Sequence, residues 1–265
     1  PRSPGFFDSP MTFGNYILLV LPMVIGLSFY SNLKTERQWL QLASLIIMAA
    51  IIFSYVRGVW LGIIGGLIFM GILRNRRLLT LVLAGIVVGF LFVVFVPSSR
   101  FAKRVTETFK SERPVGDRIY LLEGSLNIIR DYPITGVGWE GFRKVYPRYK
   151  PPKAGKVGCN AHNNFLDVAV DSGLMGLGMF LWLLAVIYKV GFNIFKKLED
   201  GYIKGIAWGF LGSFTAFLIS GLSQYNFGDS EVVMLFYFLL GMVMVIPRIG
   251  EGELNRESDH FSRVR

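Results

Sequence analysis

Cysteine and histidine are nearly absent from this chain, which has one Cys and two His among its 265 residues. The single cysteine, Cys159, has no partner for a disulfide, which excludes a disulfide-stapled secreted scaffold. So few sulfur and imidazole ligands also argue against a transition-metal site. Charged residues make up only 17% of the chain, against roughly 25% in soluble domains. This shortage excludes a water-soluble enzyme built around a single core.

Apolar residues are abundant in their place. The chain is 52% hydrophobic and contains 23 Phe and 30 Gly, and Gly is common in helices that lie in a bilayer. A membrane-spanning helix needs about 20 mostly apolar residues. Seven apolar segments approach this length, with the third one short: 13–30, 39–56, 58–73, 78–97, 165–188, 205–222 and 232–247. The pattern predicts an all-α fold, a polytopic transmembrane bundle with about seven spans.

The spacing of these segments predicts the organisation of the chain. Four transmembrane helices occupy 1–97, one large outer loop with short helices occupies 98–164, and three more spans occupy 165–247. Residues 248–265 have mixed charge and are expected to form a mobile tail. The chain starts with Pro1 and has no charged segment before a short apolar stretch, so we expect no signal peptide and a piece of a longer protein.

The Lys and Arg residues of the short connections predict the orientation. Eight of them fall on one side of the predicted membrane: Lys34, Arg37, Arg74, Arg76, Arg77, Lys196, Lys197 and Lys204. Only Arg2 and Arg57 fall in the short connections of the other side, so the first side, with the tail, is predicted to be cytoplasmic. The loop 98–162 carries thirteen Lys/Arg against six Asp/Glu, a net charge of +7. Long loops cross largely regardless of charge, and the loop is assigned to the outer side.

Within this loop, residues 117–130 show the spacing of an amphipathic helix. The apolar residues recur at three- and four-residue steps and are Ile119, Leu122, Leu126 and Ile129. Asp117 is a candidate N-cap, and Pro133 is expected to end the helix.

A glycine motif follows, with the form Gly136-x-Gly138-x-x-Gly141. It matches the dinucleotide-binding fingerprint in letters only, because that fingerprint must follow a strand and open a helix. We therefore expect these glycines to form turns, or to bring backbone N–H groups close to an anion.

Two side chains could carry chemistry by their position. Arg57 lies between two apolar runs, where an arginine either extends its charge to the lipid headgroups or faces a protein interior and grips phosphate with its planar fork. His162 stands where the loop returns to the membrane, among Asn160, Asn163 and Asn164, which could orient its ring. A structural histidine is the alternative. Nearby guanidinium groups would lower the pKa of His162 and keep its imidazole neutral, so that it can accept a proton.

Several motifs stand in a fixed order around the large loop: Gly5–Tyr16, Arg57-Gly58-Val59-Trp60, Gly116-Asp117-Arg118-Ile119-Tyr120, Ile128–Gly138, Ala161-His162-Asn163-Asn164-Phe165-Leu166 and Ser172-Gly173-Leu174-Met175-Gly176. Their order resembles that of the O-antigen ligase and polymerase superfamily of bacterial inner membranes. Together they cover roughly residues 5 to 247. Members of this superfamily are generally longer, so this chain is similar to their C-terminal part.

The resemblance implies a glycosyltransferase at the periplasmic face of the bacterial inner membrane, with no cofactor and no obligatory metal. It implies a glycan donor linked to undecaprenyl diphosphate, and an acceptor hydroxyl on lipid A-core or another glycan. In this reading Arg57 and Arg118 bind the diphosphate, and His162 is the general base. Arg130 and Arg143 are additional, weaker candidates for the same binding site. Membrane lipids are expected partners, and nucleic acid is not, because the basic residues lie between membrane spans.

Several functions remain open at this stage. A polysaccharide polymerase or a protein O-oligosaccharyltransferase would use the same donor with a different acceptor. The basic loop fits an acceptor that carries phosphates, which slightly favours the ligase. A transporter or channel would be expected to carry ionisable residues in mid-span and paired halves, and neither pattern is seen in the sequence. For a structural scaffold, a long loop rich in Arg, Tyr and Trp would be an unneeded elaboration.

Overall fold

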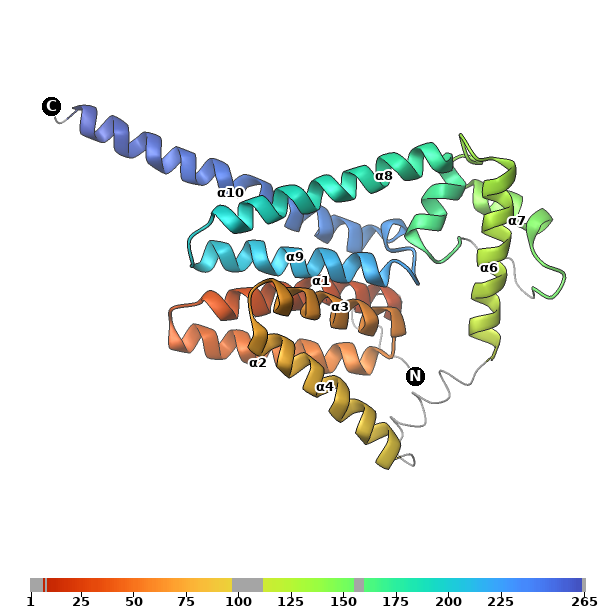
Figure 1. Ribbon diagram of the computed structural model, residues 1–265, viewed down its shortest axis with the longest axis horizontal. Helices are drawn as coiled ribbons and strands as arrows, with labels where there is room; N and C mark the ends of the chain where they lie inside the picture. Colours follow the sequence, from red (N-terminus) through yellow and green to blue (C-terminus); the bar gives the residue numbers. More distant parts are fainter. Residues whose placement is uncertain (1–6, 8, 97–111, 155–159, 264–265) are drawn as a thin grey trace. The chain divides into compact units, whose positions relative to one another are not determined.

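The structure is a computed structural model that describes residues 7, 9–96, 112–154 and 160–263. The described residues form helices and contain no strand (Figure 1). The helices are α1 (Pro10–Tyr30), α2 (Lys34–Ser54), α3 (Arg57–Leu73), α4 (Arg76–Phe95), α6 (Glu112–Asp131), α7 (Gly141–Tyr149), α8 (Asn164–Lys197), α9 (Tyr202–Ser220), the short 3-10 helix η1 (Asn226–Gly228) and α10 (Ser230–Arg263). Cys159 lies outside the described residues.

All seven predicted apolar segments fall on helices, which confirms the helical class. In the described part of the chain, five helices are long and apolar enough to cross a membrane: α1, α2, α8, α9 and the first part of α10. α3 is apolar but has only 17 residues. The chain is thus a helical protein of the membrane type, while the number of seven spans stays a prediction.

Contacts divide the chain into two compact units. The first, called the bundle unit below, contains residues up to Gly66, Ala185–Phe217 and the part from Gly228 onward. The second, called the loop unit, contains Leu67–Leu184 and Leu218–Phe227.

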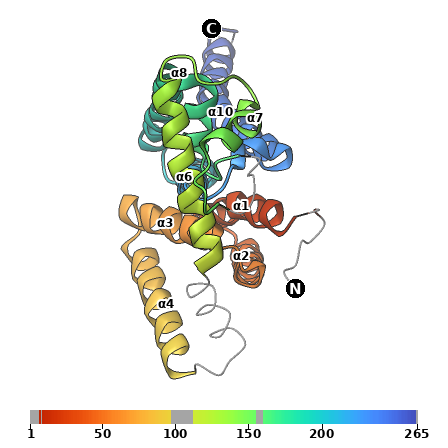
Figure 2. The same ribbon diagram turned by 90° about the vertical axis from the view of Figure 1, so that its right-hand side faces the viewer.

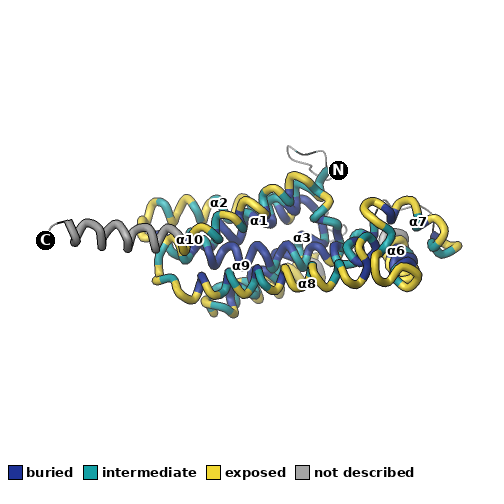
Figure 3. The backbone as a smooth tube through the Cα atoms, turned by 90° about the horizontal axis from the view of Figure 1, so that it is seen from above, coloured by how far each residue is buried: buried dark blue, intermediate teal, exposed yellow. Residues whose placement is uncertain are grey.

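In the bundle unit, α1 packs against α2 and α10. Two thirds of the apolar window of α9 (67%) is buried, against 11% for α2. Figure 3 shows the same contrast along the two helices. α9 is enclosed by other helices, whereas most side chains of the apolar helix α2 are not covered by protein. Such a helix is expected in a bilayer protein, because lipid surrounds the uncovered side chains in place of water.

Glycine allows α1 and α9 to approach closely. A Cβ built on Gly26 would collide with the carbonyl oxygen of Gly205 and lie 3.0 Å from the Cα of Gly209. Close to this contact, the Ser213 hydroxyl donates a hydrogen bond of 2.6 Å to the carbonyl of Leu19. Small residues at such a contact are typical of helix pairs in membranes.

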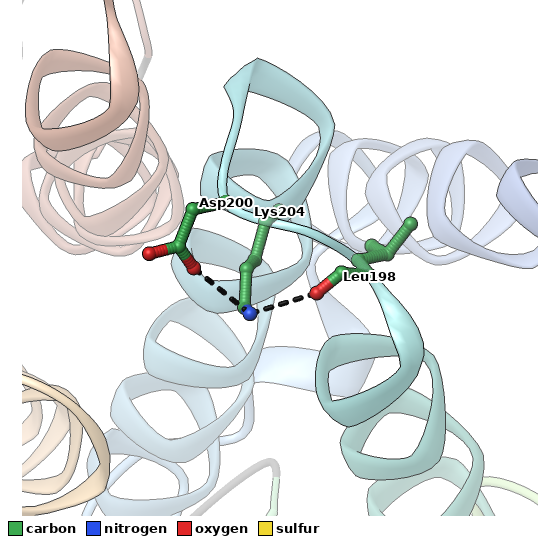
Figure 4. A network of polar contacts seen from close by, with 3 residues as sticks. All are labelled: Leu198, Asp200 and Lys204. Carbon is green, nitrogen blue, oxygen red and sulfur yellow. Dashed lines mark hydrogen bonds and ion pairs between the residues drawn. The ribbon is translucent and has the colours of Figure 1, made fainter.

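Lys204 stabilises the connection between α8 and α9. Its Nζ lies 3.0 Å from an Asp200 carboxylate oxygen and donates to the Leu198 carbonyl at 2.7 Å (Figure 4). The lysine therefore satisfies a carbonyl at the end of α8, where a positive charge is favourable.

In the loop unit, α6 and α7 share a small core. Phe142 and Tyr146 of α7 stack with ring centroids 4.9 Å apart, and they pack with Leu121 and Ile128 of α6. The Tyr149 hydroxyl also donates to Asp131 at 2.7 Å. The view in Figure 2 shows these two helices and the start of α8.

One expectation about these helices is corrected here, and three features add to what the sequence indicated. α6 begins at Glu112, so Asp117 lies within the helix and is not its N-cap. The residues Ile119, Leu122 and Leu126 do not face the core of the unit but are exposed. Residues 141–149 form α7, a helix that the sequence analysis missed. α10 continues to Arg263, through most of the residues expected to form a mobile tail, and the mobility of this part stays a prediction.

α8 is broken at Gly173, whose φ of 70° and ψ of −174° are not helical. The sharp change of direction between its short first part and its long second part is visible in Figure 1. The backbone after α6 lies against this break. Leu174 N–H donates to the Pro133 carbonyl at 2.7 Å, and Gly138 N–H donates to the Asp171 carbonyl at 2.9 Å. The contact fixes the end of α6 to the point where the long part of α8 starts.

Candidate functional site

His162 lies in the loop unit, in a tight turn just before α8. Its φ of 51° is in the left-handed region that non-glycine residues rarely adopt. Such backbone persists only where the surroundings hold it. Here its N–H donates to the Asn160 side-chain oxygen at 3.0 Å.

A buried carboxylate holds the residues on both sides of His162. Asp167, only 3% exposed, accepts the N–H of Ala161 at 2.8 Å and that of Asn163 at 3.4 Å. A carboxylate that accepts backbone N–H groups forms strong hydrogen bonds, because one partner is charged. Asp167 is therefore a positioning residue for the turn, and the sequence analysis did not identify it.

The asparagines of this segment hold backbone groups. Asn163 caps α8, since its side-chain oxygen accepts the N–H groups of Phe165 at 2.9 Å and Leu166 at 3.1 Å. Asn and Asp are favoured at this position for that reason. The sequence analysis expected the asparagines to orient the imidazole ring, whereas these hydrogen bonds fix the backbone that carries it.

The same turn is tied to the connection between α9 and α10. Asn164 N–H donates to the Gly221 carbonyl at 2.8 Å, and its side-chain oxygen accepts the N–H of Asn226 at 2.8 Å. The Asn163 amide donates to the Leu222 carbonyl at 3.0 Å. Two segments far apart in the sequence thus form one side of the site.

The electrostatics around His162 favour the neutral imidazole. Burial lowers its pKa below the ordinary value of 6.5, and the positive charge of Arg118 lowers it further. The sequence analysis expected this effect from arginine, and the structure adds burial as its larger cause. Arg118 itself is an exposed residue of α6, close enough for its charge to act on the histidine. A half-buried neutral imidazole beside a guanidinium group can accept a proton and still lie near a bound anion.

Tyr225 is a further polar group of this region. Burial raises its pKa to about 12, and the carboxylates of Asp167 and Asp171 add to the rise. The hydroxyl therefore stays protonated and can donate a hydrogen bond. Tyr225 lies in this region because the α9–α10 connection packs against the start of α8. No motif in the sequence indicates such a long-range contact.

Arg57 belongs to the bundle unit and opens α3. The turn before it is fixed by two side chains. The Ser54 hydroxyl donates to the Ile51 carbonyl at 2.7 Å, and the Trp60 indole N–H donates to the same carbonyl at 2.9 Å. Arg57 is half-buried at the N-terminus of a helix. A cation there adds to the positive end of the helix dipole, and this combination attracts an anion.

The two weaker candidates, Arg130 and Arg143, are both exposed, on α6 and α7 respectively. The loop unit thus brings Arg118 within electrostatic reach of His162, while Arg57 lies in the other unit. Among the residues described, no group of three or more His, Cys, Asp and Glu side chains could hold a metal ion.

The glycine motif forms turns, as one of its two interpretations expected. Gly136 and Gly138 have φ of 65° and 88°. Their N–H groups donate to the backbone carbonyls of Tyr132 and Asp171, so these donors stabilise the turn and are not directed at an anion.

The fold and the His162 turn define a helical membrane protein with a polar site at the start of one span, and comparison with known proteins places it in a family. The chain belongs to the O-antigen ligase family, whose profile matches residues 42–181. It is also similar to a protein of Rickettsia typhi that carries the provisional name of polysaccharide ligase, with 20% identity over 243 residues. The match covers 89% of this chain and 58% of that protein, so the chain spans less than two thirds of the length of this relative.

Proposed function

We propose that this chain carries the reaction centre of a membrane glycosyltransferase. It would move a glycan from undecaprenyl diphosphate to a hydroxyl of an acceptor, with lipid A-core as the acceptor that the basic loop favours. The observation that carries the proposal is the half-buried His162, whose pKa is lowered by burial and by the Arg118 charge, in a chain of the O-antigen ligase family.

The proposed reaction uses this neutral imidazole as general base. The acceptor oxygen forms a bond to the anomeric carbon of the donor glycan and gives its proton to a ring nitrogen of His162. The bond between that carbon and the diphosphate oxygen breaks, and the diphosphate leaves on its lipid with both electrons of the bond. Such acid–base help is worth about 10²–10⁴-fold in rate.

Arginine would stabilise the leaving group. Negative charge grows on the diphosphate as the bond breaks, and guanidinium groups placed in advance lower the energy of that state. We assign this role to Arg118 and Arg57, with Arg130 and Arg143 as weaker candidates. The half-buried Arg57 at a helix N-terminus and the charge of Arg118 near His162 support this assignment.

The proposed setting is the bacterial inner membrane, with seven spans and the reaction at the periplasmic face. The loop 98–164 would then be periplasmic and the C-terminal residues cytoplasmic, as the distribution of Lys and Arg predicts. A polymerase differs only in its acceptor, a second carrier-linked glycan, and the same assay separates the two.

The test is glycan transfer by the purified full chain in vesicles, with carrier-linked glycan as donor. Lipid A-core and a second carrier-linked glycan are offered side by side, and product mass reports which one is extended. His162→Ala should lower the rate by about 10²–10⁴-fold, whereas His260→Ala, at the second histidine of the sequence, should not change it. If His162→Ala transfers glycan within a few-fold of the original chain, His162 is not the base.

Arg57 is tested by two substitutions in the same assay. Arg57→Lys keeps the charge but loses the planar fork, and Arg57→Gln loses both. A bidentate clamp predicts that both variants are slow, with Arg57→Gln slower by about 10²–10³-fold than the original chain. Full activity of Arg57→Lys would show that a point charge is enough, and full activity of Arg57→Gln would remove Arg57 from the site.

A further inference from the structure

The helix α6 has two apolar faces, and only one of them is covered by protein. Leu121 and Ile128 are buried in the core that α6 shares with α7. A second line of apolar side chains, Ile119, Leu122 and Leu126, is 54%, 44% and 53% exposed. Residues three and four apart lie on one face of a helix, so these three form a continuous strip, called the α6 strip below. A helix of a soluble domain exposes polar side chains where α6 exposes this strip.

Arginines lie at both borders of the α6 strip. At about 100° per residue, Arg118 falls on one side of Leu122 and Arg130 falls on the other side of Ile119. Both are exposed, as are Glu123 and Asn127, which lie further round on the polar side. Helices that lie in a membrane interface typically have an apolar face bordered by basic residues. The aliphatic part of such an arginine can lie along the apolar surface while its charge stays at the level of the headgroups.

The end of α6 is fixed to the beginning of an apolar span. The Pro133 carbonyl accepts the N–H of Leu174 at 2.7 Å, where the long part of α8 starts. From that point Leu174, Met175 and Met179 are 53%, 59% and 64% exposed, as expected for side chains that face lipid. Ile134, next to the contact, is 66% exposed. The exposed apolar surface of α8 therefore continues onto the segment that follows α6.

The direction of α6 agrees with this contact. Both α6 and the part of α8 up to Leu184 belong to the loop unit. In Figure 1 α6 runs across the direction of α8 beyond its break, and in Figure 2 it is again seen at full length while α8 recedes from the viewer. A helix that lies across a membrane-spanning helix, and is attached to its end, runs along the surface of the bilayer.

We propose that the α6 strip is a membrane-contact surface that inserts into the boundary between lipid headgroups and acyl chains. The occupant is the bilayer itself. Its phosphate-bearing headgroups complement Arg130 and Arg118 at the borders of the strip, and its acyl chains cover Ile119, Leu122 and Leu126. Such helices insert about 5–10 Å into this boundary. The loop unit is then anchored to the membrane by α6 as well as by its spans.

The test measures the depth of labels on α6 in the full chain reconstituted into phospholipid vesicles. Cys159 is replaced by Ser, and a polarity-sensitive fluorophore is attached at Leu122→Cys, at Leu126→Cys, or at Asn127→Cys as the matched control on the polar side. All three positions are exposed, so the label replaces no core residue. Quenching is measured with a lipid that carries a nitroxide near its headgroup and, separately, with aqueous iodide.

The proposal expects the labels at 122 and 126 to be quenched several-fold more by the nitroxide lipid than the label at 127, with the opposite order for iodide. Equal iodide quenching at all three positions would place the strip in water and overturn the proposal. Protection of 122 and 126 from both quenchers would mean that protein covers the strip, such as a second copy of this chain, and would overturn it as well. The wavelength of label emission checks the result independently, with a blue shift expected at 122 and 126 only.

Discussion

The α1–α9 contact of the bundle unit and the break in α8 of the loop unit both require glycine, but for different physical reasons. At Gly26 a side chain would meet the backbone of α9 at Gly205 and Gly209. At Gly173 the backbone itself has φ 70° and ψ −174°, a region that is essentially restricted to glycine. The first contact needs a smooth helix surface, whereas the second needs a conformation that other residues do not adopt.

The two regions also differ in the role that we expect for them, helix packing at the α1–α9 contact and glycan transfer near the break in α8. The α1–α9 contact joins regular helices through backbone approach and a few hydrogen bonds, such as that of Ser213. The region around the break joins irregular backbone through several backbone hydrogen bonds. The short arm of α8 that precedes the break begins directly after the turn of His162. Substitutions in both regions should therefore lower stability, but only those in the second region should also disturb the geometry of the site.

The largest expected effect is at the break. Gly173→Ala should lower the free energy of unfolding by about 3 kcal/mol, because it adds both strain and a collision with the Ile134 carbonyl. The matched control is Gly178→Ala on the same helix, where a Cβ meets nothing within 4 Å. Denaturant unfolding of the purified variants measures both. Equal stability of the two variants would show that α8 does not need its break.

At the α1–α9 contact, Gly26→Ala should cost about 2 kcal/mol, since the two backbones must separate to admit a methyl group. Gly241→Ala in α10 is the control, because a Cβ there has open space. The remaining folded fraction of Gly26→Ala should transfer glycan at the original rate per folded molecule, which distinguishes this site from the loop unit. A specific loss of turnover without loss of stability would contradict the comparison.

A smaller loss of stability is expected for the carboxylate below the His162 turn. Asp167→Ala leaves the N–H groups of Ala161 and Asn163 without their acceptor, at a cost of about 1–2 kcal/mol. Hydrogen exchange at these two amides should accelerate more than exchange in α9, and the transfer rate should fall. Ser172→Ala, which removes an exposed hydroxyl bonded within α8, is the control. Unchanged exchange at residues 161 and 163 would show that Asp167 does not hold the turn.

The smallest expected change is a displacement of the pH profile. The pKa of His162 is lowered by burial and by Arg118, so its reactive neutral form persists below pH 6.5 and the transfer rate declines only as pH falls through this lowered pKa. Arg118→Gln removes the second cause, which raises the pKa and moves the acidic limb of the rate profile to higher pH. The limb should not move in Lys144→Gln, at an exposed lysine of α7. If the acidic limb of the rate profile stays in place in Arg118→Gln, the charge of Arg118 does not affect the pKa of His162.

Much of the fold follows from local patterns. Long apolar runs become helices wherever a bilayer is the solvent, because every backbone group must be satisfied within the chain. The helix around 117–130 was also predicted from its period. The side of that helix that meets the core was not, since Leu121 and Ile128 are a second apolar set and the sequence does not say which set faces protein.

α7 and the surroundings of His162 show what a single sequence conceals. Phe142 and Tyr146 are four residues apart, a helical spacing, but the basic residues between them and Pro147 obscured it. Asp167 falls near the start of the predicted span 165–188. Its role as an acceptor for the turn was not recognised, because that role depends on the left-handed backbone at His162. Tyr225 is brought to this region by a connection that long-range hydrogen bonds of Asn163 and Asn164 hold in place, and no local spacing predicts these bonds.

The broken geometry of α8 sets the depth at which the proposed reaction would occur. An unbroken helix of 34 residues would extend roughly 51 Å at 1.5 Å per residue, far more than the roughly 30 Å of hydrocarbon in a bilayer. The straight part Leu174–Lys197 extends roughly 36 Å, which matches that thickness with a modest tilt. In the proposed orientation, the short arm 164–172, with its buried carboxylate, would then lie outside the hydrocarbon layer. Each residue inserted into the straight part would shift this arm by about 1.5 Å along the membrane normal. The position of Gly173 in α8 therefore sets the height of the arm above the hydrocarbon layer.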